Sequence, residues 1–179
     1  MNSPVKFVLE FCSKSRLATI FAVTCLALSS HAADSAVQVQ LSTKDAGPRA
    51  IESLTERGIL RDYRFAWTGM AQALELNTLD PLEGPFAGEA KQQLMEAVAS
   101  QQHTNLSQQY VNQNHRLEAV FYAPEGDVME LHDTAEYQLR VSDAGKVIHD
   151  EHVVMHFIVL MTPAADRWVI RQLQAVPQF

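Results

Sequence analysis

The chain has 179 residues, of which 47% are hydrophobic, and a formal net charge of −7 at pH 7. An acidic surface repels phosphate backbones and anionic lipids, so neither nucleic acid nor a membrane surface is expected as a partner. Both cysteines, Cys12 and Cys25, lie close to the N-terminus. The rest of the chain can therefore use neither a disulfide nor a catalytic thiol, and its stability must come from a packed core.

Residues 1–32 have the pattern of a cleavable signal peptide. Basic residues precede an apolar run over residues 17–28, and small residues precede Ala33. A retained anchor is the first alternative, but a helix that spans a membrane needs about 20 apolar residues. Lipidation at Cys25 is the second, and the residues before it fit that signal poorly. We expect cleavage after Ala32 and export to the periplasm or the medium, without membrane insertion after cleavage.

Beyond the signal peptide, the length fits a single domain. Residues 33–45 are small and polar and lack a helical period, which predicts a flexible lead-in. Residues 46–179 then form the folded domain. No internal repeat or low-complexity segment interrupts it.

The first part of this domain has the apolar spacing of helices. A short helix is expected to begin near Pro48 and to end where Gly58 interrupts it. A second helix is predicted over residues 60–76 and a third over about residues 87–101.

After Asn105 the apolar period changes from 3.6 to 2, which indicates strands. Four strands are expected at residues 115–122, 127–141, 146–161 and 167–176, joined by turns rich in Gly, Pro and Asp. Helices followed by an antiparallel meander predict an α+β fold, with the N-terminal helices packed on one face of an antiparallel sheet.

This order of elements resembles the NTF2-like superfamily. The residues that carry the resemblance are Trp67, Met70, Ala71, Ala73 and Leu74 in the second helix and the closing run Asp166-Arg167-Trp168-Val169-Ile170. The short third helix and the strand from His115 look most like the Tim44-type and plastid-division-type members, which are mainly non-catalytic. The resemblance implies a cone in which the helices cap a strongly curved sheet and enclose a pocket.

The second strand offers one candidate for acid–base chemistry. Its odd positions from Met129 to Val141 are apolar and its even positions are polar, so one face is expected to be buried. Asp133 is the exception, because it is a carboxylate on the apolar face. Facing a pocket, it could act as a general base, with Tyr137 or Tyr63 donating a hydrogen bond to a developing oxyanion. The alternatives are an ion at the rim and a β-bulge that turns Asp133 outward.

The polar face of the same strand offers a candidate metal site. Closing the next hairpin with Val141 opposite Val147 pairs two outer positions of each strand, namely His132 with His156 and Glu136 with His152. Three imidazoles and a carboxylate could bind zinc or copper. The alternative is a polar outer surface or a dimer seam. Because the third strand is apolar on both faces from Val153 to Met161, a second subunit is expected to cover it, which predicts a homodimer.

A ligand pocket is expected to be lined mainly by aromatic side chains, since these offer apolar area with a polar tip. The candidates are Tyr63, Trp67, Phe86, Asp133, Tyr137 and Trp168. No phosphate-binding glycine loop or hydrolase motif is present in the sequence, and no cofactor is expected.

Three functions follow from these patterns. The leading hypothesis is an exported, non-catalytic NTF2-like domain that binds a small apolar molecule or a protein partner. The second is a small isomerase, lyase or hydrolase that uses Asp133 as its general base. The third is metal binding through the histidine cluster.

Overall fold

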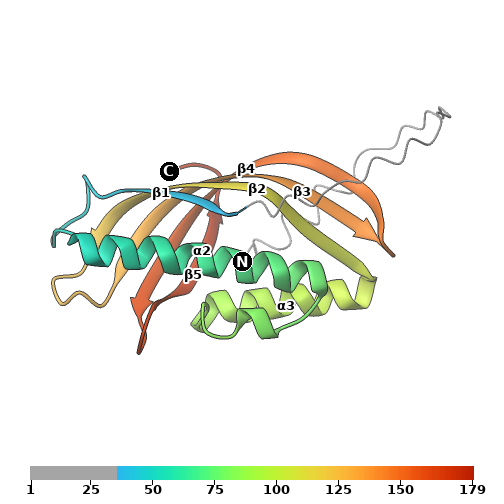
Figure 1. The fold of residues 1–179 in the computed structure, drawn as a ribbon, viewed down its shortest axis with the longest axis horizontal. Helices are drawn as coiled ribbons and strands as arrows, with labels where there is room; N and C mark the ends of the chain where they lie inside the picture. The colour runs from blue at the N-terminus through green and yellow to red at the C-terminus, as the bar shows by residue number, and fades with distance from the viewer. Residues whose placement is uncertain (1–35) are drawn as a thin grey trace.

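The computed structural model describes residues 36–179, and the predicted signal peptide lies outside the described residues. Within this part the elements, shown in Figure 1, follow one another as β1 (Gln38–Ser42), α2 (Ser53–Leu76), the 3-10 turn η1 (Asp80–Leu82), α3 (Gly88–Thr104), β2 (Leu106–Tyr122), β3 (Met129–Asp143), β4 (Lys146–Pro163) and β5 (Trp168–Val176). The helices precede the long meander, as the sequence pattern predicts.

The five strands form one sheet in the order β1-β2-β3-β4-β5. The meander from β2 to β5 is antiparallel, whereas β1 runs parallel to β2. Both helices lie on the same side of the sheet (Figure 1). The α+β class is therefore confirmed, with the difference that β1 makes the sheet mixed. Among the described residues no helix is both long and apolar enough to span a bilayer.

Strand β1 corrects the prediction of a flexible lead-in over residues 33–45. Its Val39 is buried, and the Val39 carbonyl accepts a hydrogen bond of 3.1 Å from the Arg64 guanidinium. The five-residue strand is too short to show a clear period in the sequence. Its partner, β2, comes after both helices in the chain, so the pairing depends on contacts that local sequence does not reveal.

Helix α2 corrects the prediction of two helices separated by Gly58. One helix runs from Ser53 to Leu76 and contains Gly58. A glycine inside a helix costs only about 1 kcal/mol relative to alanine, which tertiary packing readily outweighs. The buried residues Ile59, Tyr63 and Trp67 supply that packing against the sheet.

Two β-bulges in β2 change which side chains point toward the helices. The pairing with β3 shifts between Val111 and Asn114 and again between Ala119 and Phe121. Before the first shift Gln108 is buried, and after it His115 is buried. An extra residue in one strand moves the following side chains to the other face, so the bulge brings both groups to the helix-facing side.

A third bulge corrects the predicted register of β3 and β4. Val141 lies opposite His149, and Ser142 lies opposite Val147, so Ile148 is the extra residue. Every pair beyond the bulge is displaced by two positions from the prediction. The displaced outer positions are His132 opposite Ile158, Glu136 opposite Val154, Thr134 opposite His156 and Gln138 opposite His152.

Candidate ligand pocket and a buried polar cluster

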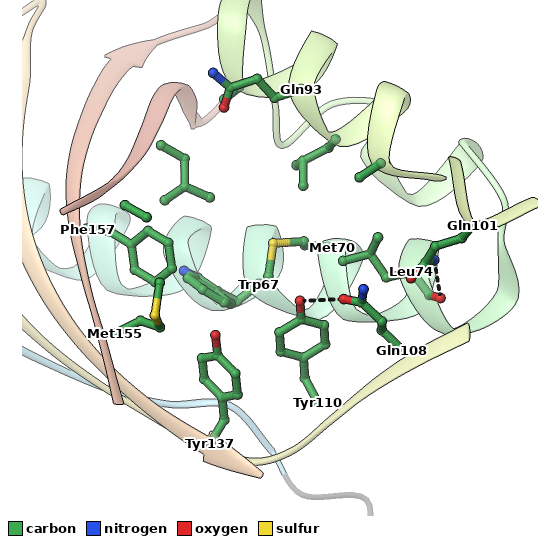
Figure 2. Close-up of a pocket in the computed structure, with 15 residues that line it drawn as sticks. Trp67, Met70, Leu74, Gln93, Gln101, Gln108, Tyr110, Tyr137, Met155 and Phe157 are labelled. Carbon is green, nitrogen blue, oxygen red and sulfur yellow. Dashed lines mark hydrogen bonds between the residues drawn. The ribbon is translucent and has the colours of Figure 1, made fainter. Parts of the chain in front are cut away.

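A pocket of about 80 Å³ lies between the two helices and the inner face of the sheet. Figure 2 shows α2 contributing Trp67, Met70 and Leu74, and Tyr137 pointing in from the sheet. The remaining lining residues are Ala90, Gln93, Leu94, Ala97 and Gln101 from α3 and Gln108, Tyr110, Met155, Phe157, Leu173 and Ala175 from the sheet. The lining is mostly apolar with a few amide and phenol groups.

The polar groups of the pocket are held by specific hydrogen bonds. The Tyr110 hydroxyl donates to Gln108 Oε1 at 3.1 Å (Figure 2). The Gln101 amide donates to the Leu74 carbonyl oxygen at 2.9 Å. Burial raises the pKa of both Tyr110 and Tyr137 above the usual value of a phenol. Both phenols therefore remain neutral hydroxyl groups at physiological pH.

Behind the pocket lies a cluster of three polar side chains that are fully buried. The Tyr63 hydroxyl donates to Asp133 Oδ2 at 2.7 Å, and His115 Nδ1 shares a hydrogen bond of 2.8 Å with the same oxygen. All three residues have 0% exposure. Burial, followed by the charge of Asp133, raises the pKa of Tyr63 well above its ordinary value. We call Tyr63, Asp133 and His115 the buried cluster.

Trp67 separates the buried cluster from the pocket. The ring centroid of Trp67 lies 4.2 Å from that of His115. The Trp67 side chain also lines the pocket. Three buried atoms here have no hydrogen-bond partner among the described residues, namely Trp67 Nε1, His115 Nε2 and Asp133 Oδ1. Unpaired buried polar atoms are rare in proteins because each costs about 1–3 kcal/mol. The cluster thus carries unpaired polar atoms one side chain away from the pocket.

The six predicted pocket residues lie in different parts of the fold: two line the pocket, two belong to the buried cluster, and two lie elsewhere. Trp67 and Tyr137 line the pocket. Tyr63 and Asp133 belong to the buried cluster, so a rim position or an outward turn of Asp133 is excluded. Tyr137 makes no hydrogen bond with Asp133, and the group that donates to this carboxylate is Tyr63.

The other two aromatic candidates are structural. Phe86 is buried and joins Ile170 of β5 through an isolated bridge. Trp168 lies against Tyr122, with ring centroids 6.2 Å apart. Neither lines the pocket.

Sequence reasoning missed His115 and the side of the pocket formed by β2. His115 is the first residue of the strand predicted over residues 115–122, and its inward direction follows from the bulge at Asn112 and Gln113. Tyr110 and Gln108 lie in a part of β2 that was not expected to be a strand. The sequence offers little signal for them, because three polar residues separate Leu106 from Tyr110 and no apolar alternation results.

The predicted metal site does not form. The described residues contain no group of three or more His, Cys, Asp or Glu side chains that could hold a metal ion. His152 pairs with Glu136 at 3.0 Å, while His132 stacks on the Phe179 ring with centroids 4.4 Å apart. His156 lies 3.3 Å from the Thr134 hydroxyl. The observed register no longer pairs His132 with His156, and the Phe179 ring contacts both imidazoles.

Comparison with known proteins gives one finding about the fold. No family model and no curated protein matches the chain. Among solved structures, the intermembrane space region of chloroplast protein ARC6 matches with a TM-score of 0.56 and 13% sequence identity, covering 72% of this chain and 98% of that chain. The class that fold and pocket define is an α+β domain with two helices packed against a five-stranded mixed sheet. At this identity the likeness extends to the fold alone.

Proposed function

We propose that this protein is an exported, non-catalytic domain of the NTF2-like type, which binds an apolar group in the pocket between its helices and its sheet. The observation that carries the proposal is the pocket itself, with its apolar lining and its few fixed polar groups. Such a combination is typical of binding sites that take up an apolar body and orient it through one or two hydrogen bonds.

The size of the pocket limits what it holds. A drug-sized ligand usually occupies about 300–1,000 Å³, whereas an engineered apolar cavity of about 150 Å³ binds benzene. At about 80 Å³, the pocket fits one end of a small apolar molecule or one apolar side chain of a protein partner. Both occupants agree with the chemistry of the lining.

Two further observations support the non-catalytic and exported character. Among the described residues no carboxylate lines the pocket, and Asp133 is sealed behind Trp67. The sequence has a predicted signal peptide over residues 1–32. We therefore propose that the domain works outside the compartment in which it is made.

The test fills the pocket from α3. In Ala97→Leu the longer side chain enters the pocket, because Ala97 is buried and lines it. We expect loss of binding of anilinonaphthalene sulfonate, an apolar fluorescent probe, while the fold is retained by circular dichroism. Ala99→Leu is the matched control, since Ala99 lies on the exposed side of the same helix. Native mass spectrometry of the exported protein then identifies any bound molecule.

Equal probe binding by wild type and Ala97→Leu would contradict the proposal. So would a wild-type protein that binds no probe and carries no bound mass. A co-purified organic molecule that Ala97→Leu lacks and Ala99→Leu retains would support it and supply the ligand.

A second candidate function is catalysis by the buried cluster. Asp133 holds His115 through Nδ1, an arrangement that orients an imidazole whose Nε2 can take up a proton. Asp133 itself is the general base of the sequence-based hypothesis. Either role requires Trp67 to move, because the cluster has no exposure.

Turnover of a panel of carbonyl, epoxide and ester substrates tests this second candidate. Activity that disappears in both Asp133→Asn and His115→Gln, with both variants folded, would support it. Activity retained in both variants, or no activity in the wild type, would remove it.

A further inference from the structure

The polar side chains that line the pocket differ in whether they already have a hydrogen-bond partner. Gln93 donates to Glu89 Oε1 at 2.9 Å. The Gln101 amide donates to the Leu74 carbonyl oxygen and to Asn77 Oδ1, at 2.9 and 2.8 Å. The amide groups of both glutamines are therefore engaged within the fold.

Two other donors of the pocket have no acceptor among the described residues. The Tyr137 hydroxyl makes no hydrogen bond there, and Gln108 accepts from Tyr110 at its Oε1 while its amide nitrogen has no partner. Both residues are more than nine-tenths buried, since Tyr137 is 3% and Gln108 is 7% exposed. Figure 2 shows the Tyr137 hydroxyl directed into the pocket and the Gln108 amide beside Tyr110.

A ligand can reach these two donors, unlike the other unpaired atoms nearby. Trp67 Nε1 and Gln101 Oε1 also lack a partner, but both atoms are enclosed by protein atoms. The Tyr137 hydroxyl and Gln108 Nε2 are not enclosed in this way. A buried donor without an acceptor is unfavourable, so these two groups favour a ligand that brings an acceptor of its own.

The acceptor is expected on a neutral group. No charged side chain lines the pocket within the described part of the chain, and burying a charge without a partner costs far more than burying a neutral polar group. The two donors are neighbours, because the Tyr110 ring lies 5.0 Å from the Tyr137 ring and its hydroxyl donates to Gln108. A carbonyl oxygen suits them, since it has two lone pairs and no hydrogen.

We infer that the pocket takes up a neutral apolar molecule that carries a carbonyl oxygen, and that Tyr137 and Gln108 donate hydrogen bonds to this oxygen. The inference rests on the proposed function, because it names the chemistry of the ligand that the pocket binds. Tyr137 is the residue that sets the preference for a carbonyl. The fold makes no use of its hydroxyl, which is free for the ligand.

Three small probes of similar shape test the inference. Hexan-2-one carries the carbonyl, 2-methylhex-1-ene replaces its oxygen by a methylene group, and pentanoate replaces its terminal methyl group by an ionised oxygen. Amide chemical shifts of the exported protein, followed by NMR during titration, give each affinity. Hexan-2-one should bind at least about threefold more tightly than the alkene, which leaves both donors unpaired, and more tightly than pentanoate, whose charge has no partner in the pocket.

Tyr137→Phe removes the hydroxyl and keeps the ring. Because no hydrogen bond within the fold is lost, the variant should remain folded by circular dichroism. Its affinity for hexan-2-one should fall at least about threefold, while its affinity for 2-methylhex-1-ene stays unchanged. Tyr122→Phe is the matched control and should keep the wild-type preference, since Tyr122 is buried against Trp168 and lies outside the pocket.

The infrared stretching frequency of the bound ketone gives a second measurement. A hydrogen bond to a carbonyl oxygen lowers this frequency, so bound hexan-2-one should absorb at a higher frequency in Tyr137→Phe than in wild type and Tyr122→Phe. A purely structural role of the Tyr137 ring would not produce this difference.

Equal affinity of the wild type for hexan-2-one and 2-methylhex-1-ene would overturn the inference and leave a purely apolar pocket. Pentanoate that binds as tightly as the ketone, or a folded Tyr137→Phe variant that keeps the wild-type preference for the ketone, would also overturn it. So would the absence of binding by all three probes. Failure of the proposed function is distinguished from these outcomes, because it is measured with anilinonaphthalene sulfonate and Ala97→Leu.

Discussion

The titratable groups on the two faces of β3 differ greatly in how much they contribute to the stability of the fold. Asp133 points inward, has no exposure and accepts hydrogen bonds from one or two buried partners. His132, its neighbour in sequence, points outward, lies 3.4 Å from Glu130 and stacks on Phe179. A buried polar group that loses its partner costs far more than an exposed ion pair contributes. Sequence position alone thus says little about the importance of a charged residue.

The largest expected effect is at Asp133. Asp133→Ala leaves the Tyr63 hydroxyl and the His115 ring without their common acceptor, so we expect a loss of about 3–5 kcal/mol in the free energy of unfolding. Asp133→Asn, which keeps an acceptor oxygen, should lose less. Urea denaturation followed by circular dichroism measures both. An Asp133→Ala variant as stable as wild type would show that the cluster is not energetically coupled.

A smaller effect is expected at Tyr63, whose hydroxyl donates the hydrogen bond that Asp133 accepts. Tyr63→Phe removes the donor to Asp133 Oδ2 and keeps the packed ring, so the loss should be about 1.5–3 kcal/mol. Tyr110→Phe is the comparison, because the Tyr110 hydroxyl donates to the neutral amide of Gln108. Its loss should be nearer to about 1 kcal/mol. A larger loss of stability in Tyr110→Phe than in Tyr63→Phe would contradict the prediction that the hydrogen bond within the buried cluster contributes more.

The buried phenol also predicts a loss of stability at alkaline pH. The pKa of Tyr63 is raised in the folded protein by burial and then by Asp133, whereas an unfolded tyrosine titrates near pH 10. The unfolded state therefore loses its proton first, and stability falls as pH rises above about 10. Urea midpoints between pH 8 and 11 should fall less steeply for Tyr63→Phe than for wild type. Equal slopes would mean that the phenol of Tyr63 reaches solvent.

The smallest effect is expected on the outer face. Glu136→Gln removes the charge that pairs with His152 at 3.0 Å and leaves two exposed side chains. We expect a change within about 0.5 kcal/mol in urea denaturation. A larger loss would show that the outer face is covered, as it would be by a second subunit on the sheet surface.

The positions of the strands were predicted from the sequence better than the pairing between them. The change of period at Asn105 located the meander, and the alternation around Asp133 gave the correct inward face of β3. The pairing between strands was predicted with less success, because the hairpin closes one position earlier, with Ser142 opposite Val147, and Ile148 then forms a bulge. Together the two differences displace every following pair by two positions. The same cause removed the expected metal site, since that site required His132 opposite His156.

The buried cluster was predicted only in part for a similar reason. Asp133 and Tyr63 were identified from their types and positions, whereas His115 depends on the bulge in β2. The bulge contains Asn112 in the left-handed conformation, with φ 55°, which asparagine tolerates better than most residues. An asparagine alone does not locate a bulge in a sequence, because asparagine is also common in turns. The pocket was affected in the same way, because Tyr110 and Gln108 lie before that bulge.

Strand β1 has a consequence for the way in which the chain folds. Gln38 pairs with Asn114, and both helices lie between these two residues in the chain. Contacts between distant parts of a chain slow folding, because the intervening segment must be ordered before the contact forms. β1 should therefore join the sheet last, after the helices and the meander have come together. Its amides should be the last of the strand amides to gain protection in hydrogen exchange during refolding.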